Sequence, residues 1–161
     1  MSIMTTHPEA EIIVDKEVPL VRIIREFDAP AAKVYQAHID PELFVKWNGP
    51  DYLTTTPVVW DARTGGSYRY TMTGEGTDTA FNGVFHELRE NELIVQTFSW
   101  EGMPDGVALE KLRIEDLPGG RSRLTSTSLV DSFEDRDAFV ASGMEVGIVE
   151  GYNKLDDLLA A

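Results

Sequence analysis

The alternation of apolar and polar positions divides the chain into a β-rich centre with helical segments on either side. Residues 20–27 alternate and are rich in β-branched side chains, which predicts a strand. From residue 53 to residue 130 the pattern stays β-like, and turn-forming residues break it into short runs. The strands predicted there are 53–60, 66–73, 80–88, 92–100, 107–116 and 121–130. Their short connections indicate antiparallel hairpins, since parallel strands need crossovers of about a dozen residues or more.

Two short helices are predicted between the first long strand and this region. Asp28 is expected to cap the first helix, with Pro30 in its first turn. Asp40 begins the second helix in the same way, and the pair Gly49 and Pro50 ends it.

The C-terminal segment predicts one long helix over residues 133–160. Ser132 and Asp135 form a start that resembles a capping box, and apolar residues then recur at helical spacing. Such a helix would be roughly 40 Å long and could cross a whole sheet. The order of elements is typical of an α+β fold with helices on one face of a curved sheet. Residues 1–17 are expected to form an N-terminal arm or an extra edge strand of this single domain, residues 1–161.

Composition narrows the possible partners. The chain has 161 residues, no cysteine and a formal net charge of -14. The charge repels nucleic-acid phosphates and anionic headgroups, so we expect no nucleic-acid partner. The absence of cysteine excludes disulfides and thiolate metal sites. No signal peptide or membrane-inserting run is visible, so we expect a cytoplasmic protein.

Six local motifs occur in an order and at a spacing that resemble the START-like (SRPBCC) superfamily. They lie at residues 25–30, 40–43, 47–50, 65–70, 83–85 and 142–145. Over roughly residues 18–161 the chain is similar to bacterial homologues of the C-terminal domain of the heat-shock ATPase activator, the AHSA-like family. The resemblance implies a helix-grip fold, with a curved antiparallel sheet of six to seven strands wrapped around the long C-terminal helix. It implies function only broadly, because family members bind varied ligands.

Strand alternation places one row of side chains from each strand on the face toward the C-terminal helix. These rows mix aromatic residues with polar ones that a dry core rarely contains, which favours a ligand cavity. A solid core is the alternative, since aromatic rows commonly pack together. The residues expected to line the cavity are Trp47, Tyr68, Tyr70, Met72, Phe81, Phe85, Gln96, Phe98, Trp100, Glu110, Leu112, Ser126, Ser128, Met144, Gly147 and Tyr152.

Three glycines recur every four residues in the predicted C-terminal helix: Gly143, Gly147 and Gly151. Each glycine costs a helix interior roughly 0.5–1 kcal/mol relative to alanine, so the stripe needs a physical reason. One hypothesis is that it leaves room for ligand in the cavity. The other is a close approach of the helix to the sheet or to a dimer partner.

Glu110 is the candidate for acid–base chemistry. If it faces inward, burial would raise its pKa, and a partner such as Arg113 or a tyrosine would be needed. The alternative is that the alternation along this strand is reversed, so that Glu110 points outward and is exposed. The three histidines show no metal-ligand spacing, and His38 is expected to pack on the first helix. We expect neither a metal nor a cofactor.

Three functions remain open from the sequence. The first is binding of a small hydrophobic or lipid-like ligand in the cavity. The second is an enzyme of the polyketide cyclase or hydrolase kind that uses the same cavity, with Glu110 or a tyrosine as catalyst. The third is a module that interacts with a chaperone ATPase, which rests on fold-level analogy. A homodimer is compatible with all three, although no residue identifies an interface.

Overall fold

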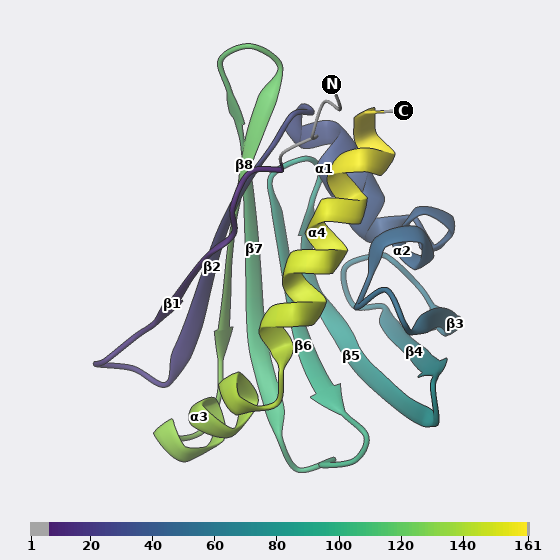
Figure 1. Ribbon diagram of the computed structural model, residues 1–161, viewed down its shortest axis with the longest axis vertical. Coiled ribbons are helices and arrows are strands. Elements are labelled where there is room, and N and C mark those ends of the chain that lie inside the picture. Colours follow the sequence, from purple (N-terminus) through teal and green to yellow (C-terminus); the bar gives the residue numbers. More distant parts are fainter. Residues whose placement is uncertain (1–6, 161) are drawn as a thin grey trace, which may run out of the picture.

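One curved antiparallel sheet carries the fold in the computed structural model, which describes residues 7–160 (Figure 1). Its eight strands lie in the order β1-β2-β8-β7-β6-β5-β4-β3. The strands are β1 (Glu11–Val14), β2 (Leu20–Phe27), β3 (Thr54–Trp60), β4 (Ser67–Gly74), β5 (Thr77–Arg89), β6 (Leu93–Trp100), β7 (Val107–Leu117) and β8 (Arg121–Leu129). The expected α+β architecture is confirmed. The expected count of six to seven strands is wrong, because β1 adds an eighth strand beside β2.

Four helices accompany the sheet among the described residues. They are α1 (Ala31–Ile39), α2 (Pro41–Trp47), α3 (Phe133–Ala141) and α4 (Met144–Ala160). The helices α1 and α2 follow β2, and α4 crosses in front of the sheet beside them, as the yellow helix in Figure 1 shows. None of the described helices is both long enough and apolar enough to cross a lipid bilayer.

The two short helices begin differently from one another. Asp40 caps α2 as expected, because its side chain accepts a hydrogen bond from the backbone N–H of Glu42. The expected capping of α1 by Asp28 is wrong, since Pro30 is the cap residue and makes no side-chain bond. Instead, the N–H of Ala31 donates to Asp116 of β7 at 2.8 Å. Asp28 is held by Arg121, whose Nε lies 2.9 Å from its carboxylate.

The C-terminal helical segment is two helices rather than one. Ser132 caps α3 by accepting from the N–H of Asp135, as the sequence predicts. Gly143 then adopts a φ of 87°, a left-handed conformation that glycine tolerates and a helix interior does not contain. The apolar spacing continues across this break because Phe139 of α3 packs against the core, as Met144 and Ile148 of α4 do.

The C-terminal half of α4 is fixed by buried polar contacts and by a close backbone approach. Arg25 of β2 is 1% exposed and donates to the carbonyl of Tyr152 and to the side chain of Asn153. Asp156 lies 3.9 Å from the same guanidinium. A Cβ on Gly151 would lie 3.1 Å from the carbonyl oxygen of Trp47, which shows how closely α4 meets α2.

Two irregularities in the sheet shape its inner face. The register shifts between Pro57 and Val59 in β3, and again between Phe85 and Glu87 in β5. Next to the second shift, a Cβ on Gly83 would lie 2.0 Å from the carbonyl oxygen of Thr97. Only glycine fits there, and β-bulges of this kind bend a strand and increase its twist.

Candidate functional site

A cavity of about 800 Å³ lies between the inner face of the sheet and the helices α2 and α4. Every residue that the sequence predicts as cavity-lining borders it. Its walls come from β4 to β8 and from both helices, so segments far apart in the chain meet around one space. The row from β7, with Ala108, Glu110 and Leu112, lies at its base. Pockets of 300–1,000 Å³ are the usual size for small organic ligands.

Aromatic rings form much of the wall. Phe81 and Phe98 are stacked, with ring centroids 5.1 Å apart and planes 17° apart. Tyr70 stacks on Phe81 at 5.5 Å, and Trp47 stacks on Tyr152 at 6.0 Å. Such aromatic contacts add about 0.5–1.5 kcal/mol each beyond simple burial, so they stabilise the wall.

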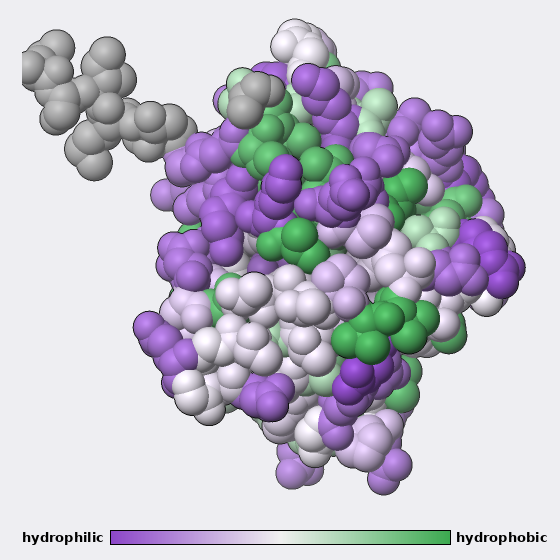
Figure 2. Space-filling view, turned by 90° about the vertical axis from the view of Figure 1, so that its right-hand side faces the viewer, coloured by the Kyte–Doolittle hydropathy of each residue, from purple (hydrophilic) through white to green (hydrophobic). Residues whose placement is uncertain are grey.

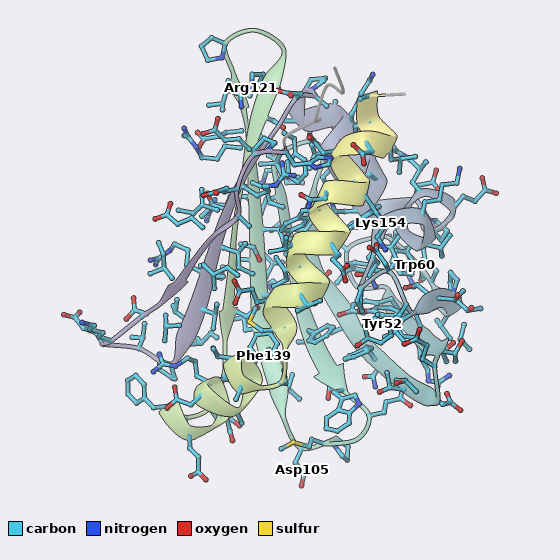
Figure 3. The ribbon with its side chains drawn as sticks, in the orientation of Figure 1. Tyr52, Trp60, Asp105, Arg121, Phe139 and Lys154 are labelled. Atoms are coloured by element: carbon cyan, nitrogen blue, oxygen red, sulfur yellow. The ribbon has the colours of Figure 1, made fainter. Side chains whose placement is uncertain are left out.

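The cavity opens to solvent at the end where α4 begins. Exposed apolar side chains that border the cavity mark this rim: Tyr52, Trp100, Met103, Val107 and Val146. Figure 3 shows labelled residues around this end, with Tyr52 on one side of α4, Phe139 near its start and Asp105 at the tip of the β6–β7 loop. The loop folds against Trp100, since a Cβ on Gly102 would lie 2.2 Å from that ring.

Glu110 stands in a polar cluster that spans three neighbouring strands. The register pairs it directly with Gln96 of β6 and with Ser128 of β8. Gln96 Nε2 donates to Glu110 Oε1 at 3.0 Å, and Ser128 Oγ donates to Oε2 at 2.6 Å. Burial raises the pKa of Glu110, and these two hydrogen bonds oppose that shift. Arg113, one of the partners expected beside a tyrosine, is exposed on the opposite face because it lies three positions further along the strand.

Three tyrosines lie within electrostatic reach of Glu110. Burial first, and then the Glu110 charge, raise the pKa of Tyr68, Tyr70 and Tyr152 well above the usual phenol value. All three are therefore neutral phenols at physiological pH. The hydroxyl of Tyr68 donates to the carbonyl of Thr97 at 2.6 Å, in the space that Gly83 leaves open.

His38 of α1 also borders the cavity, although the sequence favoured a packing role for it. Its ring packs on Trp47, with centroids 4.8 Å apart, and Nδ1 lies 2.7 Å from the carbonyl oxygen of Val34. Burial lowers the pKa of His38 to about 4, so the ring is neutral. Nε2 is buried and has no hydrogen-bond partner within residues 7–160.

The three glycines of the predicted stripe have three different surroundings. Gly143 lies between the helices, so it does not belong to a stripe. Gly147 borders the cavity, and a Cβ there would make an ordinary 3.5 Å contact with Pro50. Gly151 supports the close-approach hypothesis, because its neighbours are backbone atoms of Trp47 and Gly49. The approach is to α2, however, and not to the sheet.

The site also contains residues that the sequence analysis missed. Besides His38, they include Phe44 of α2, Trp60 of β3 and Ile148 of α4. Trp60 is anchored by its indole N–H, which donates to the carbonyl of Ile39 at 2.7 Å. The sequence contained a signal for Phe44, because this residue shares the apolar side of its helix with Trp47. No feature of the sequence indicated which face of that helix meets the cavity.

The described residues offer no obvious metal site. No three His, Cys, Asp or Glu side chains within residues 7–160 gather as a metal ion would require. The polar groups inside the cavity are instead spaced among aromatic rings, which is the arrangement of a site for an organic molecule.

Solved structures with this architecture come from several bacteria. The protein Ms6760 from Mycobacterium smegmatis is 25% identical, with a TM-score of 0.86 over 95% of this chain and 98% of that chain. A protein from Arthrobacter aurescens is 27% identical, with a TM-score of 0.85 over 93% and 91%. DynU16, a protein of the dynemicin biosynthetic locus, shares the fold at 17% identity and a TM-score of 0.66, over 89% of this chain and 48% of its own. No curated protein matches the chain.

The sequence model of one family covers most of the chain. Residues 28–160, from the end of β2 to the end of α4, match the model described as Activator of Hsp90 ATPase homolog 1-like protein. The matched span includes every strand and helix that borders the cavity except β2. The chain therefore belongs to the Activator of Hsp90 ATPase homolog 1-like family.

Proposed function

We infer that the protein binds a small, mainly apolar organic molecule in the cavity under α4. The observation that supports this inference most is the cavity of about 800 Å³, whose largely aromatic wall contains the polar cluster centred on Glu110. Cavities that bind organic ligands combine apolar walls with a few placed polar groups in this way. The exposed apolar rim supports the proposal further, because it gives such a molecule a path of entry.

Native mass spectrometry of the purified protein, followed by denaturation and extraction, tests this proposal. We expect a retained small molecule, or else saturable binding of a fluorescent apolar probe. The variant Gly147→Leu should weaken probe binding, because a leucine at that position extends toward the space between α4 and Pro50. Val149→Leu is the matched control, since Val149 is on α4 but does not border the cavity. Equal binding by both folded variants would contradict the proposal.

A second candidate is an enzyme of the cyclase or hydrolase kind in the same cavity. One observation favours it: the pKa of Glu110 is raised, and the carboxyl borders the cavity beside neutral phenols. A carboxyl with a raised pKa can exchange a proton with a bound substrate near neutral pH. Incubation of the retained molecule with the protein, followed by mass analysis, distinguishes the candidates. An enzyme changes the molecule, and Glu110→Gln should bind it without changing it.

A further inference from the structure

The charged groups around the cavity are all of one sign. Glu110 lies inside, and Asp131 and Asp135 border the end near α3. No lysine or arginine is among the described residues that line the cavity. Arg25 is buried beneath α4, but its guanidinium is directed at the Tyr152 carbonyl and Asp156. A carboxylate ligand would therefore enter without a cation to pair with it.

Glu110 can accept more hydrogen bonds than it receives from the protein. Each of its oxygens accepts one, from Gln96 and from Ser128. A carboxylate offers about four acceptor positions, so about two remain for a ligand. The direct cross-strand pairing with both neighbours fixes the carboxyl group in place.

His38 presents no hydrogen-bond donor to the cavity, and its hydrogen-bond geometry determines the tautomer. The carbonyl of Val34 can only accept, so the proton of the neutral ring must be on Nδ1. Nε2 is then a bare lone pair. His38 is 9% exposed, and Nε2 has no partner within the described residues. Nε2 has almost no accessible surface, so a cavity ligand does not reach it, and the ring offers such a ligand no donor.

The hydroxyl of Tyr68 likewise offers no hydrogen-bond donor to a ligand. Its proton is already directed at the carbonyl of Thr97, so only its lone pairs are free. The hydroxyls of Ser126, Tyr70 and Tyr152 can either donate or accept. Among these groups Glu110 and Tyr68 act only as acceptors, and Gln96 keeps one N–H that Glu110 does not use.

From this arrangement we propose that the cavity selects a neutral or cationic aromatic molecule that donates a hydrogen bond to Glu110, and that it rejects the carboxylate of the same skeleton. The stacked rings of Phe81 and Phe98 supply the aromatic preference. This inference rests on the proposed function and narrows its ligand class. It excludes fatty acids and aromatic acids from that class, and it includes phenols, aromatic alcohols and amines.

A matched series of naphthalene probes tests the proposal. The probes are 2-methylnaphthalene, 2-naphthalenemethanol, 2-naphthylmethylamine and 2-naphthoate, with affinities measured by calorimetry at neutral pH. We expect the alcohol and the amine to bind roughly tenfold or more tightly than 2-naphthoate. Glu110→Gln should remove most of the amine's advantage over 2-methylnaphthalene while the affinity for 2-methylnaphthalene itself stays unchanged.

The acidic protein as a whole could attract the cationic amine, and the variant Glu90→Gln is the control for this effect. Glu90 is exposed in the β5–β6 turn and does not border the cavity, so this variant should keep the full preference. If 2-naphthoate binds as tightly as the amine, the selectivity proposal is overturned and the binding function stands. An amine preference that Glu90→Gln reduces as much as Glu110→Gln also overturns it. If none of the four probes binds, the proposed function and the selectivity fail together.

Discussion

The buried histidine of α1 makes stability depend on pH in a way that the structure predicts. His38 has a pKa of about 4 in the folded state, against an ordinary value of 6.5. Between these values the unfolded chain binds more protons than the folded one. The stabilisation is therefore complete above pH 6.5 and is lost as the pH falls toward 4. Linkage gives a loss of about 2 kcal/mol in the free energy of unfolding between pH 7 and pH 5.

The variant His38→Phe isolates this effect. Phenylalanine keeps an aromatic ring against Trp47 and removes both the titration and the unpaired Nε2. We expect its stability at pH 7 to be within about 1 kcal/mol of the wild type, because the lost hydrogen bond and the relieved desolvation oppose each other. Between pH 7 and pH 5, the difference in unfolding free energy between the two proteins should shift by about 2 kcal/mol in favour of the variant. This shift corresponds to roughly 4–8 °C in melting temperature.

Urea unfolding at pH 7 and pH 5 measures the difference directly. Carboxylates such as Asp15 and Glu101, whose pKa values are lowered by hydrogen bonds, also lose stability in acid, but they do so in both proteins. The exposed His86 supplies the matched control, and His86→Gln should follow the wild type at both pH values. If His38→Phe shows the wild-type pH dependence, His38 is not a buried neutral histidine and the reasoning is refuted.

Three further predictions concern Glu110, the tightly packed Gly83 and the start of α1. Glu110→Gln should stabilise the protein at neutral pH, because the raised pKa of Glu110 means that its ionised form is disfavoured in the folded state. Melting curves should show this gain disappear as the pH falls below that pKa, where the wild-type carboxyl is protonated. Gly83→Ala should lower the melting temperature strongly, because the new Cβ would lie 2.0 Å from the Thr97 carbonyl oxygen. An unchanged melting temperature would contradict this close approach of β5 to β6. Asp116→Ala should cost about 1 kcal/mol by removing the α1 cap, and Asp28→Ala should cost less in the same urea titration.

The sheet was largely predictable because its strands follow a simple local rule. Alternation of side chains along β4 to β8 determines which residues face inward, and all the expected residues on that face border the cavity. The same rule would have excluded Arg113 as a partner for Glu110, since the two residues are on opposite faces. The true partners, Gln96 and Ser128, depend on the register between strands, which a single sequence does not specify.

The helical parts were harder to predict because their details depend on contacts from distant segments. The cap of α1 comes from Asp116, which lies 85 positions along the chain from Ala31, so no local pattern contains it. The break at Gly143 has a local signal in the pair Ser142 and Gly143, but the apolar spacing continues across it and concealed the break. The position of His38 at the cavity depends on how α1 and α2 pack together, which also has no local signature.

The size of the cavity follows from which inward positions are small. Ala108, Ser126 and Ser128 border the cavity from the strands, and Gly147 borders it from α4. Leucine or isoleucine at such positions would fill the space and bury about 1.5–3 kcal/mol of apolar side chain each. The chain instead carries side chains too short to reach across, and it places the Glu110 cluster between them. A sequence under selection for stability alone would gain by filling this space. The small residues and the buried polar cluster together therefore support a binding site for a molecule from outside the chain.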